Sequence, residues 1–219
     1  MARPKSPRPE LLVVVSDLHC GSSVGLLPPD SEIVGGNTIN FGKNHHQAWL
    51  WQCWQDAQAQ VAKLAGKDPF ALLVNGDATE GIHHRSPEVV ASLIEHHCAM
   101  AATALKPWAD KADKWHLQIA GCRVDAAHHI GATSRAYLEA SALSIVLGNA
   151  RLNSIRAGHP CAQVFLRAHR HCGGVYSDGS GMMCVTGGWQ FLTRHGHKVV
   201  GDAIPRPSVL VLDWRGKPS

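Results

Sequence analysis

The sequence has no long apolar run, and this absence excludes several classes of protein. After the basic, proline-rich start, the apolar run from Leu11 to Val15 is too short for the core of a signal peptide or for a membrane span. The seven cysteines are scattered, odd in number and without a Cys-x-x-Cys pair, which is typical of reduced thiols. We therefore expect a cytoplasmic protein that has no membrane partner.

Clustered charge and repeated sequence are also absent. The formal net charge is +4, but five of the positive charges lie in the terminal segments, at Arg3, Lys5, Arg8, Arg215 and Lys217. No basic patch points to nucleic acid, which stays open as a partner without being indicated. With 219 residues, 45% of them hydrophobic, we expect a disordered basic tail over residues 1–9 and a single globular domain over residues 10–214.

Histidine, by contrast, is abundant. The sequence contains 15 histidines, several of them in adjacent pairs. Neutral imidazole is the commonest metal ligand in proteins, so this number favours a metal site without locating it. Most of the histidines must still be structural or surface residues, and we expect this of four that lie in predicted helices: His45, His46, His96 and His97.

Four short apolar segments, which read as buried strands, each end on acids or histidines. The polar residues that follow them are Asp17 and His19, Asp77, His128 and His129, and His169 and His171. If the strands lie in one sheet, their carboxyl ends are neighbours, and open α/β sheets bind ligands at that edge. Carboxylates mixed with imidazoles suit one or two ions of Mn, Fe, Zn or Ni, and a pair of such ions lies about 3.5–4 Å apart.

Apolar periodicity predicts a first helix from about Asn44 to Ala65, which Gly66 ends. We expect one stripe of this helix to pack in the core: Trp49, Leu50, Cys53, Trp54, Ala57, Val61 and Leu64.

Two further helices are predicted. One has Ser86 as its N-cap and runs from Pro87 to about Leu105, and the other covers residues 133–156 with a break near Gly148. Residues 21–42 read as a long loop, and short strands are expected on both sides of Gly121 and after His171. Strands alternate with helices first and follow one another closely later, which favours two sheets with helices outside.

The motifs "SDLHCG", "NGDATEG", "DAAHHIG" and "RAHRH", in this order, resemble those of the calcineurin-like metallophosphoesterases. The longer segments "GDATEGIHHR", "AHHIGATSRAYLEASAL" and "GGWQFLTRHGHKVV" are similar to a subgroup of that family found in phage and bacterial genomes. The resemblance covers about residues 11–213. It implies an α/β fold, a four-layer α/β/β/α sandwich.

The resemblance also implies a ligand set for two metal ions. Asp17, His19, Asp77 and His171 would hold one ion, with Asp77 bridging, and His128 and His169 would belong to the second. His128 is preferred to His129 because the family's isolated histidine is the first polar residue after its strand. Glu80 reads equally well as a residue that orients a histidine and as a surface residue.

One family motif is missing. Between the Gly-Asp motif and the isolated histidine, the family has a strand ending in Gly-Asn-His, or Gly-Thr-x-x-His in the subgroup, which supplies a metal ligand and the histidine usually assigned as general acid. This chain looks internally shortened near Ala112 to Trp115. The residues that could replace the acid are His129, His83 and His84.

The expected activity is therefore hydrolysis of a phosphomonoester or phosphodiester through a metal-bound hydroxide. The substrate would be a nucleotide, a nucleic acid or a small phosphoester. Two alternatives remain open from the sequence. One is a catalytically degenerate, metal-binding member of the same fold, which the shortened centre favours. The other is a nuclease-like DNA-processing enzyme, which a basic groove would favour.

Overall fold

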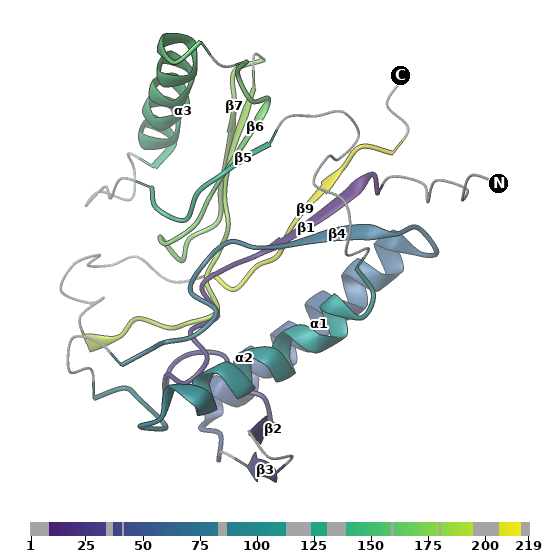
Figure 1. Cartoon of the computed structure of the whole chain (residues 1–219), viewed down its shortest axis with the longest axis vertical. Helices are drawn as coiled ribbons and strands as arrows, with labels where there is room; N and C mark the ends of the chain where they lie inside the picture. The colour runs from purple at the N-terminus through teal and green to yellow at the C-terminus, as the bar shows by residue number, and fades with distance from the viewer. Residues whose placement is uncertain are drawn as a thin grey trace.

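The structure, a computed structural model, describes residues 9–33, 37–40, 42–82, 87–112, 124–130, 139–158, 160–179, 181–194 and 206–215 (Figure 1). The strands are β1 Leu11–Val15, β2 Asp30–Ile33, β3 Asn37–Asn40, β4 Phe70–Val74, β5 Val124–Ala126, β6 Val164–Arg167, β7 Gly174–Ser177, β8 Met182–Val185 and β9 Leu210–Asp213. The helices are α1 His45–Ala65, α2 Ile94–Ala109 and α3 Glu139–Arg156. Several expectations lie outside the described residues: His83, His84, Ser86, the first hairpin strand before Gly121, the strand at 197–202, and most of the shortened centre.

The first sheet has three strands in the order β4-β1-β9. β1 and β4 run parallel, with Leu11 opposite Phe70 and Val15 opposite Val74, and β1 coincides with the apolar run Leu11 to Val15. β9 lies antiparallel on the other side of β1. Because β1 and β4 are parallel neighbours, the residues that follow them leave the sheet at the same edge.

The second sheet has four strands in the order β5-β6-β8-β7, and β5 runs parallel to β6 with Ala126 opposite Leu166. The hypothesis that all four site-bearing strands share one sheet is therefore wrong, since each sheet contributes two of them. Alternate residues explain this arrangement. Leu12 and Val14 of β1 point to one face and pack on Leu166 of β6, so the sheets stack face to face.

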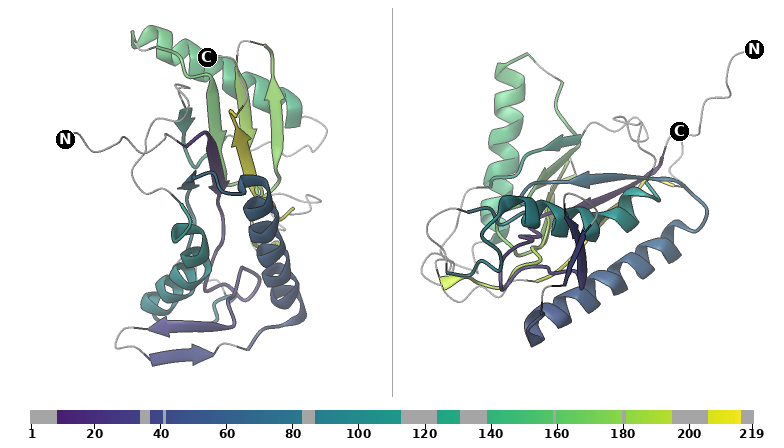
Figure 2. Two further views of the ribbon diagram at one scale, coloured as in Figure 1. Left: turned by 90° about the vertical axis from the view of Figure 1, so that its right-hand side faces the viewer. Right: turned by 60° about the horizontal axis from the view of Figure 1, so that its bottom comes forward.

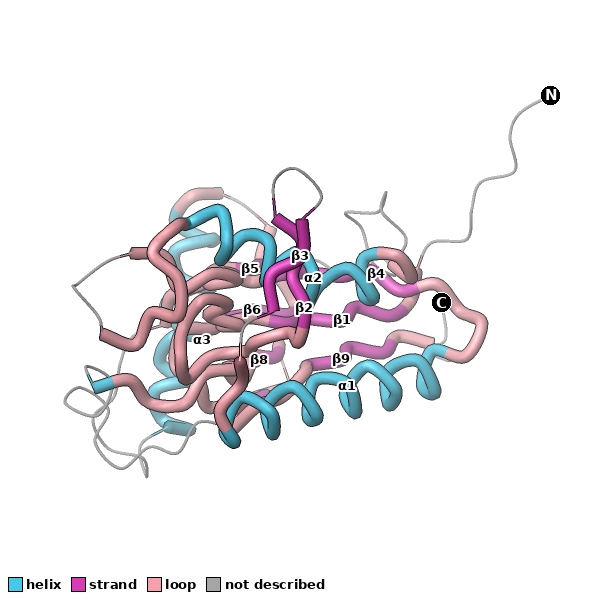
Figure 3. Tube along the Cα trace, turned by 90° about the horizontal axis from the view of Figure 1, so that it is seen from below, coloured by secondary structure: helices cyan, strands magenta, loops and turns pink. Residues whose placement is uncertain are grey.

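Three apolar clusters confirm the four-layer α/β/β/α architecture. Between the sheets, side chains of β1 and β9 meet those of β6 and β8. The other face of the first sheet packs on α1 and α2, and the outer face of the second sheet packs on α3. Figure 1 shows α1 and α2 together on one side of the first sheet, away from α3, and Figure 3 shows the same elements from below. Among the described helices, none combines the length and apolarity required to cross a membrane.

Helix α1 begins and ends where the sequence predicts. The side chain of Asn44 accepts a hydrogen bond from the backbone of Gln47, whose side chain accepts one from the backbone of Asn44. Gly66, with a φ of 60°, ends the helix. Within the expected stripe, Leu50, Trp54 and Val61 are buried, and Cys53 and Ala57 are partly buried.

Two residues of the stripe are exceptions. Trp49 is 51% exposed and Leu64 is 46% exposed, so the expectation that both lie in the core is wrong. The ring of Trp49 lies beside that of Phe191, with centroids 5.7 Å apart, and Leu64 lines a cavity together with Val211 of β9.

The segment before α2 is not helical. The structure begins this helix at Ile94 and not at Pro87, because the backbone of Val90 donates a hydrogen bond to Gly21 and Val89 pairs with Ser22. This segment therefore pairs with the loop that follows β1. The same long loop also contains a hairpin, β2 with β3, which lies at the end of the molecule opposite α3 (Figure 2).

Helix α3 runs through Gly148 without a break, which corrects the expected interruption. A glycine inside a helix costs only about 1 kcal/mol. That cost is offset here because Leu143 and Leu147 bury their side chains against Phe165 and Met183 of the second sheet.

Candidate metal centre

The ends of β1, β4, β5 and β6 bring six of the sequence-predicted site residues together, two strands from each sheet. One group places ligand atoms of Asp17, Asp77, His128 and His169 within 4.8 Å of one another, and a second does so for Asp17, His19 and His171. His129 forms a third group with His128 and His169. Of the expected site residues, His83 lies outside the described part of the chain.

Backbone strain is concentrated at these residues. Among the described residues, the non-glycine positions with positive φ are Asp17, His19, Asp77, His169 and His171, with φ between 43° and 72°. This left-handed conformation is costly for residues with a Cβ, and it persists only where the surrounding structure enforces it. Asp17 and His19 thus reach one centre through a turned backbone and not through alternation along an extended strand.

Hydrogen bonds between the loops after β1 and β4 enforce this conformation. The backbone of His19 donates to the carbonyl of Asp77 at 2.9 Å, and the backbone of Asp17 donates to that of Gly76 at 3.2 Å. The carboxylate of Asp17 also accepts a hydrogen bond from the backbone of His169 at 3.2 Å, which joins the two sheets.

Three of the histidines are oriented through Nδ1. This atom lies 2.8 Å from the carbonyl oxygen of Asn75 in His128, 3.3 Å from that of Gln190 in His171, and 2.9 Å from Oε2 of Glu80 in His19. Carbonyl and carboxylate oxygens only accept hydrogen bonds, so each Nδ1 carries the proton. In the neutral ring the lone pair is then on Nε2, which faces the centre.

The Nε2 atoms face carboxylate oxygens. His128 Nε2 lies 3.1 Å from Asp77 Oδ2 and 3.9 Å from Asp17 Oδ1, and His19 Nε2 lies 3.7 Å from Asp77 Oδ2. His171 Nε2 lies 3.5 Å from Asp17 Oδ1. Both carboxylates therefore lie between imidazoles of the two groups. In each of these pairs a carboxylate oxygen faces an unprotonated Nε2, so both atoms are hydrogen-bond acceptors.

Two of these atoms are buried without a hydrogen-bond partner: Asp17 Oδ1 and His19 Nε2. Asp17 is fully buried, and an unpaired carboxylate in such a place is strongly unfavourable unless a cation neutralises it. A divalent ion satisfies both carboxylates and the inward lone pairs at once, so the residues present fit a metal ion.

The surroundings of His169 and His171 favour the metal-binding form of both imidazoles, although His169 is the more exposed of the two. Desolvation, followed by the nearby His19, lowers the pKa of His171. Desolvation, followed by the nearby His129 and His128, lowers the pKa of His169. Both imidazoles are thus held neutral near pH 7, which is the form that binds metals.

Glycines permit the close packing around the imidazoles. A Cβ on Gly76, whose φ is 91°, would lie 2.3 Å from Nδ1 of His128, and one on Gly188 would lie 2.6 Å from Cγ of His171. Each histidine ring therefore rests directly on backbone.

Asn75 and Gln190 orient His128 and His171 through their carbonyl oxygens, a role that the sequence did not reveal. A backbone carbonyl leaves no signal in residue type, although Asn75 stands in the quoted "NGDATEG". The side chain of Asn75 also donates to the carbonyl of Ala127, which ties the end of β4 to the end of β5.

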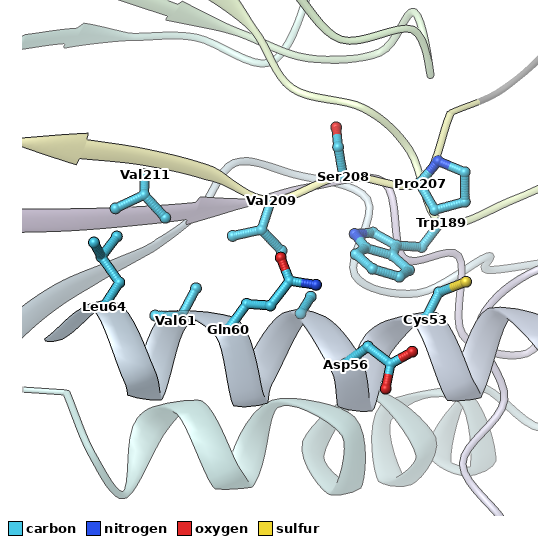
Figure 4. Close-up of a pocket in the computed structure, with 11 residues that line it drawn as sticks. Cys53, Asp56, Gln60, Val61, Leu64, Trp189, Pro207, Ser208, Val209 and Val211 are labelled. Carbon is cyan, nitrogen blue, oxygen red and sulfur yellow. The ribbon is translucent and has the colours of Figure 1, made fainter. Parts of the chain in front are cut away.

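The centre is closed on one side and open on the other. Asp17 is fully buried, the side chain of Asp77 is 39% exposed, and His129 and His169 are exposed. A cavity of about 600 Å³ lies elsewhere, between α1 and β9, where Trp189, Val209 and Leu64 line it (Figure 4). None of the candidate ligands lines that cavity.

No protein-family model matches the sequence, and the search of curated proteins finds no match. Solved structures do resemble the chain. Vps29 of Entamoeba histolytica complexed with zinc matches with 12% identity and a TM-score of 0.43, over 94% of this chain and 86% of that one. A single mutant of the same Vps29 has 11% identity, a TM-score of 0.39 and coverages of 92% and 84%. A conserved protein of Streptococcus pneumoniae described as a predicted phosphoesterase has 12% identity, a TM-score of 0.36 and coverages of 95% and 86%.

Proposed function

We propose that this protein is a metal-dependent phosphoesterase that hydrolyses a phosphomonoester or a phosphodiester. The observation that carries the proposal is the set of inward-facing acceptors: the carboxylates of Asp17 and Asp77 and the Nε2 atoms of three oriented histidines, with buried atoms left unpaired. The motifs that resemble those of the calcineurin-like metallophosphoesterases contribute these same residues.

The candidate ligands divide between two metal positions. Asp17, His19 and His171 would hold one ion, and His128 and His169 would hold the other, with Asp77 between them. Such ions supply Lewis acidity, which polarises phosphoryl oxygens and lowers the pKa of water. Mn, Fe, Zn and Ni are the ions that this mixture of imidazole and carboxylate suits.

The chain itself directs the substrate to the open side of the centre. A phosphoryl group can approach past Asp77 and His169, because Asp17 is sealed behind them. Two dications against two carboxylates leave a charge of roughly +2, which attracts an anionic ester. Glu80 accepts hydrogen bonds from Nδ1 of His19 and from Nε2 of Gln190, and these bonds hold His19 in place.

The test combines metal analysis with hydrolysis. The purified full chain is analysed for bound metal and assayed with Mn²⁺ on an activated phosphodiester and an activated phosphomonoester. Asp77→Asn is expected to lower kcat/KM by at least ~100-fold, because it removes a charge shared by both metal positions. The matched control is Asp110→Asn at the C-cap of α2, since this side chain is 55% exposed and its only ion pair among the described residues is with Lys106. This control is expected to keep full activity.

Other outcomes would replace the proposal. If the protein binds stoichiometric metal but shows no hydrolysis that depends on Asp77, it is a degenerate metal-binding protein. Cleavage of single- or double-stranded DNA far faster than that of the small esters would favour the nuclease alternative.

A further inference from the structure

Three histidines, His128, His129 and His169, lie together at the open side of the metal centre. We propose that they form a three-imidazole metal position, in which His129 is a ligand, and that this position selects a transition-metal ion over Mg²⁺. The proposal rests on the metal centre of the proposed function and assigns its outer position.

Ring geometry supports one common ion. The ring centroid of His129 lies 4.5 Å from that of His169 and 5.0 Å from that of His128, and the centroids of His128 and His169 are 5.2 Å apart. All three pairs are steeply inclined, with interplanar angles of 66° to 74°. One ring nitrogen of each residue lies within 4.8 Å of the other two.

Packing does not account for this cluster. His129 and His169 are both exposed, and in the described part of the chain neither imidazole makes a hydrogen bond. The three rings instead converge, with one nitrogen of each close to those of the other two. A bound cation that accepts a lone pair from each ring accounts for this convergence.

The backbone explains how two successive histidines reach one ion. Adjacent side chains of a strand point to opposite faces, so His128 and His129 could not converge within a strand. β5 ends at Ala126, before the pair, and the carbonyl of His128 then accepts a hydrogen bond from the backbone of Ala168 at 2.9 Å. This bond places the turn after β5 beside His169.

Donor chemistry predicts the selectivity. The group of His128, His129 and His169 offers three nitrogen donors, and Asp77 Oδ2 lies 3.1 Å from His128 Nε2 beside it. Imidazole-rich sites suit Zn²⁺, Co²⁺ and Ni²⁺, whereas Mg²⁺ requires oxygen ligands. The inner position contains Asp17, His19 and His171. Even if Asp77 contributes an oxygen to both positions, oxygen atoms make up a larger fraction of the ligands at the inner position than at the outer one.

The test is a metal titration of the metal-free full chain with Zn²⁺ and with Co²⁺. The wild type is expected to bind two equivalents, and excess Mg²⁺ should not displace the weaker one. His129→Ala should lower the affinity for one equivalent by at least ~10-fold, leave the other unchanged, and alter the visible absorption of bound Co²⁺. His45→Ala, which removes an exposed histidine of α1, is the matched control and should change nothing.

Two results would overturn the inference. One is that His129→Ala binds both equivalents with wild-type affinity and an unchanged Co²⁺ spectrum. If hydrolysis of esters with poor leaving groups then falls selectively, His129 is a proton donor instead. The other is displacement of both ions by Mg²⁺. Neither readout depends on hydrolysis, so an inactive wild type that binds two ions would refute the phosphoesterase proposal and leave this one standing.

Discussion

Glu80 and Gln190 are joined by a buried hydrogen bond of 2.7 Å from Gln190 Nε2 to Glu80 Oε2. Glu80 Oε2 also accepts from Nδ1 of His19, and the carbonyl of Gln190 accepts from Nδ1 of His171. One residue pair therefore orients both histidines of the inner metal position. Such supporting contacts tune metal affinity without touching the metal.

Gln190→Leu removes the hydrogen bond from the Gln190 side chain to Glu80 with little change in side-chain volume, and it keeps the Gln190 backbone carbonyl that His171 uses. We expect about 10- to 100-fold weaker binding of the inner metal ion, because His19 loses the support of a fixed Glu80. Metal titration measures this, and Gln60→Leu, at an exposed site of α1, is the control. Equal affinities in Gln190→Leu and wild type would show that Glu80 is held without Gln190.

Asp17→Asn should stabilise the metal-free protein while weakening its metal binding. The amide nitrogen can donate to the Nε2 atoms of His171 and His128, which now face an unpaired carboxylate oxygen. We expect a gain of about 1–3 kcal/mol in the free energy of unfolding without metal. Urea denaturation with and without Zn²⁺ checks this, and a loss of stability in the metal-free variant would contradict the proposed tautomers.

Two glycine substitutions should have opposite effects. Gly76→Ala is expected to destabilise the protein and weaken metal binding, because its Cβ would clash with His128 at a positive φ. Gly148→Ala has open space around it within α3 and should be stabilising by about 0.5–1 kcal/mol. Thermal melting and metal titration of both variants measure the contrast. A destabilised Gly148→Ala would contradict the uninterrupted helix.

The metal-free protein should lose stability as the pH falls. Because the pKa values of His169 and His171 are lowered in the folded state, the unfolded chain binds more protons between those values and about 6.5. The free energy of unfolding should therefore be highest above about pH 6.5 and decrease as the pH falls through this window. Urea midpoints over a pH series measure it, and replacing both histidines by Asn should flatten the dependence.

The sequence by itself determined the local parts of this protein. Short apolar runs predicted the strands β1 and β4, and Asn44 and Gly66 predicted both ends of α1. These features depend on neighbouring residues only, through side-chain periodicity and the capping of free backbone groups. The candidate ligands could be picked out from the sequence for the same reason, since each of them follows a recognisable strand.

Tertiary structure alone decided how those residues meet. The burial of strand faces decides that β1 and β4 form one sheet while β5 and β6 form another. The segment around Val90 is not helical because the backbone of Val90 donates a hydrogen bond to Gly21, which is brought near only by folding. The partners of His128 and His171 are likewise backbone carbonyls that carry no local pattern. Glu80 was readable from the sequence as a residue that orients a histidine, but only the fold shows that its partner is His19. Residue types can therefore name the candidate ligands, whereas only the packing of the two sheets sets their tautomers, their strained backbone and the place of His129 beside His169.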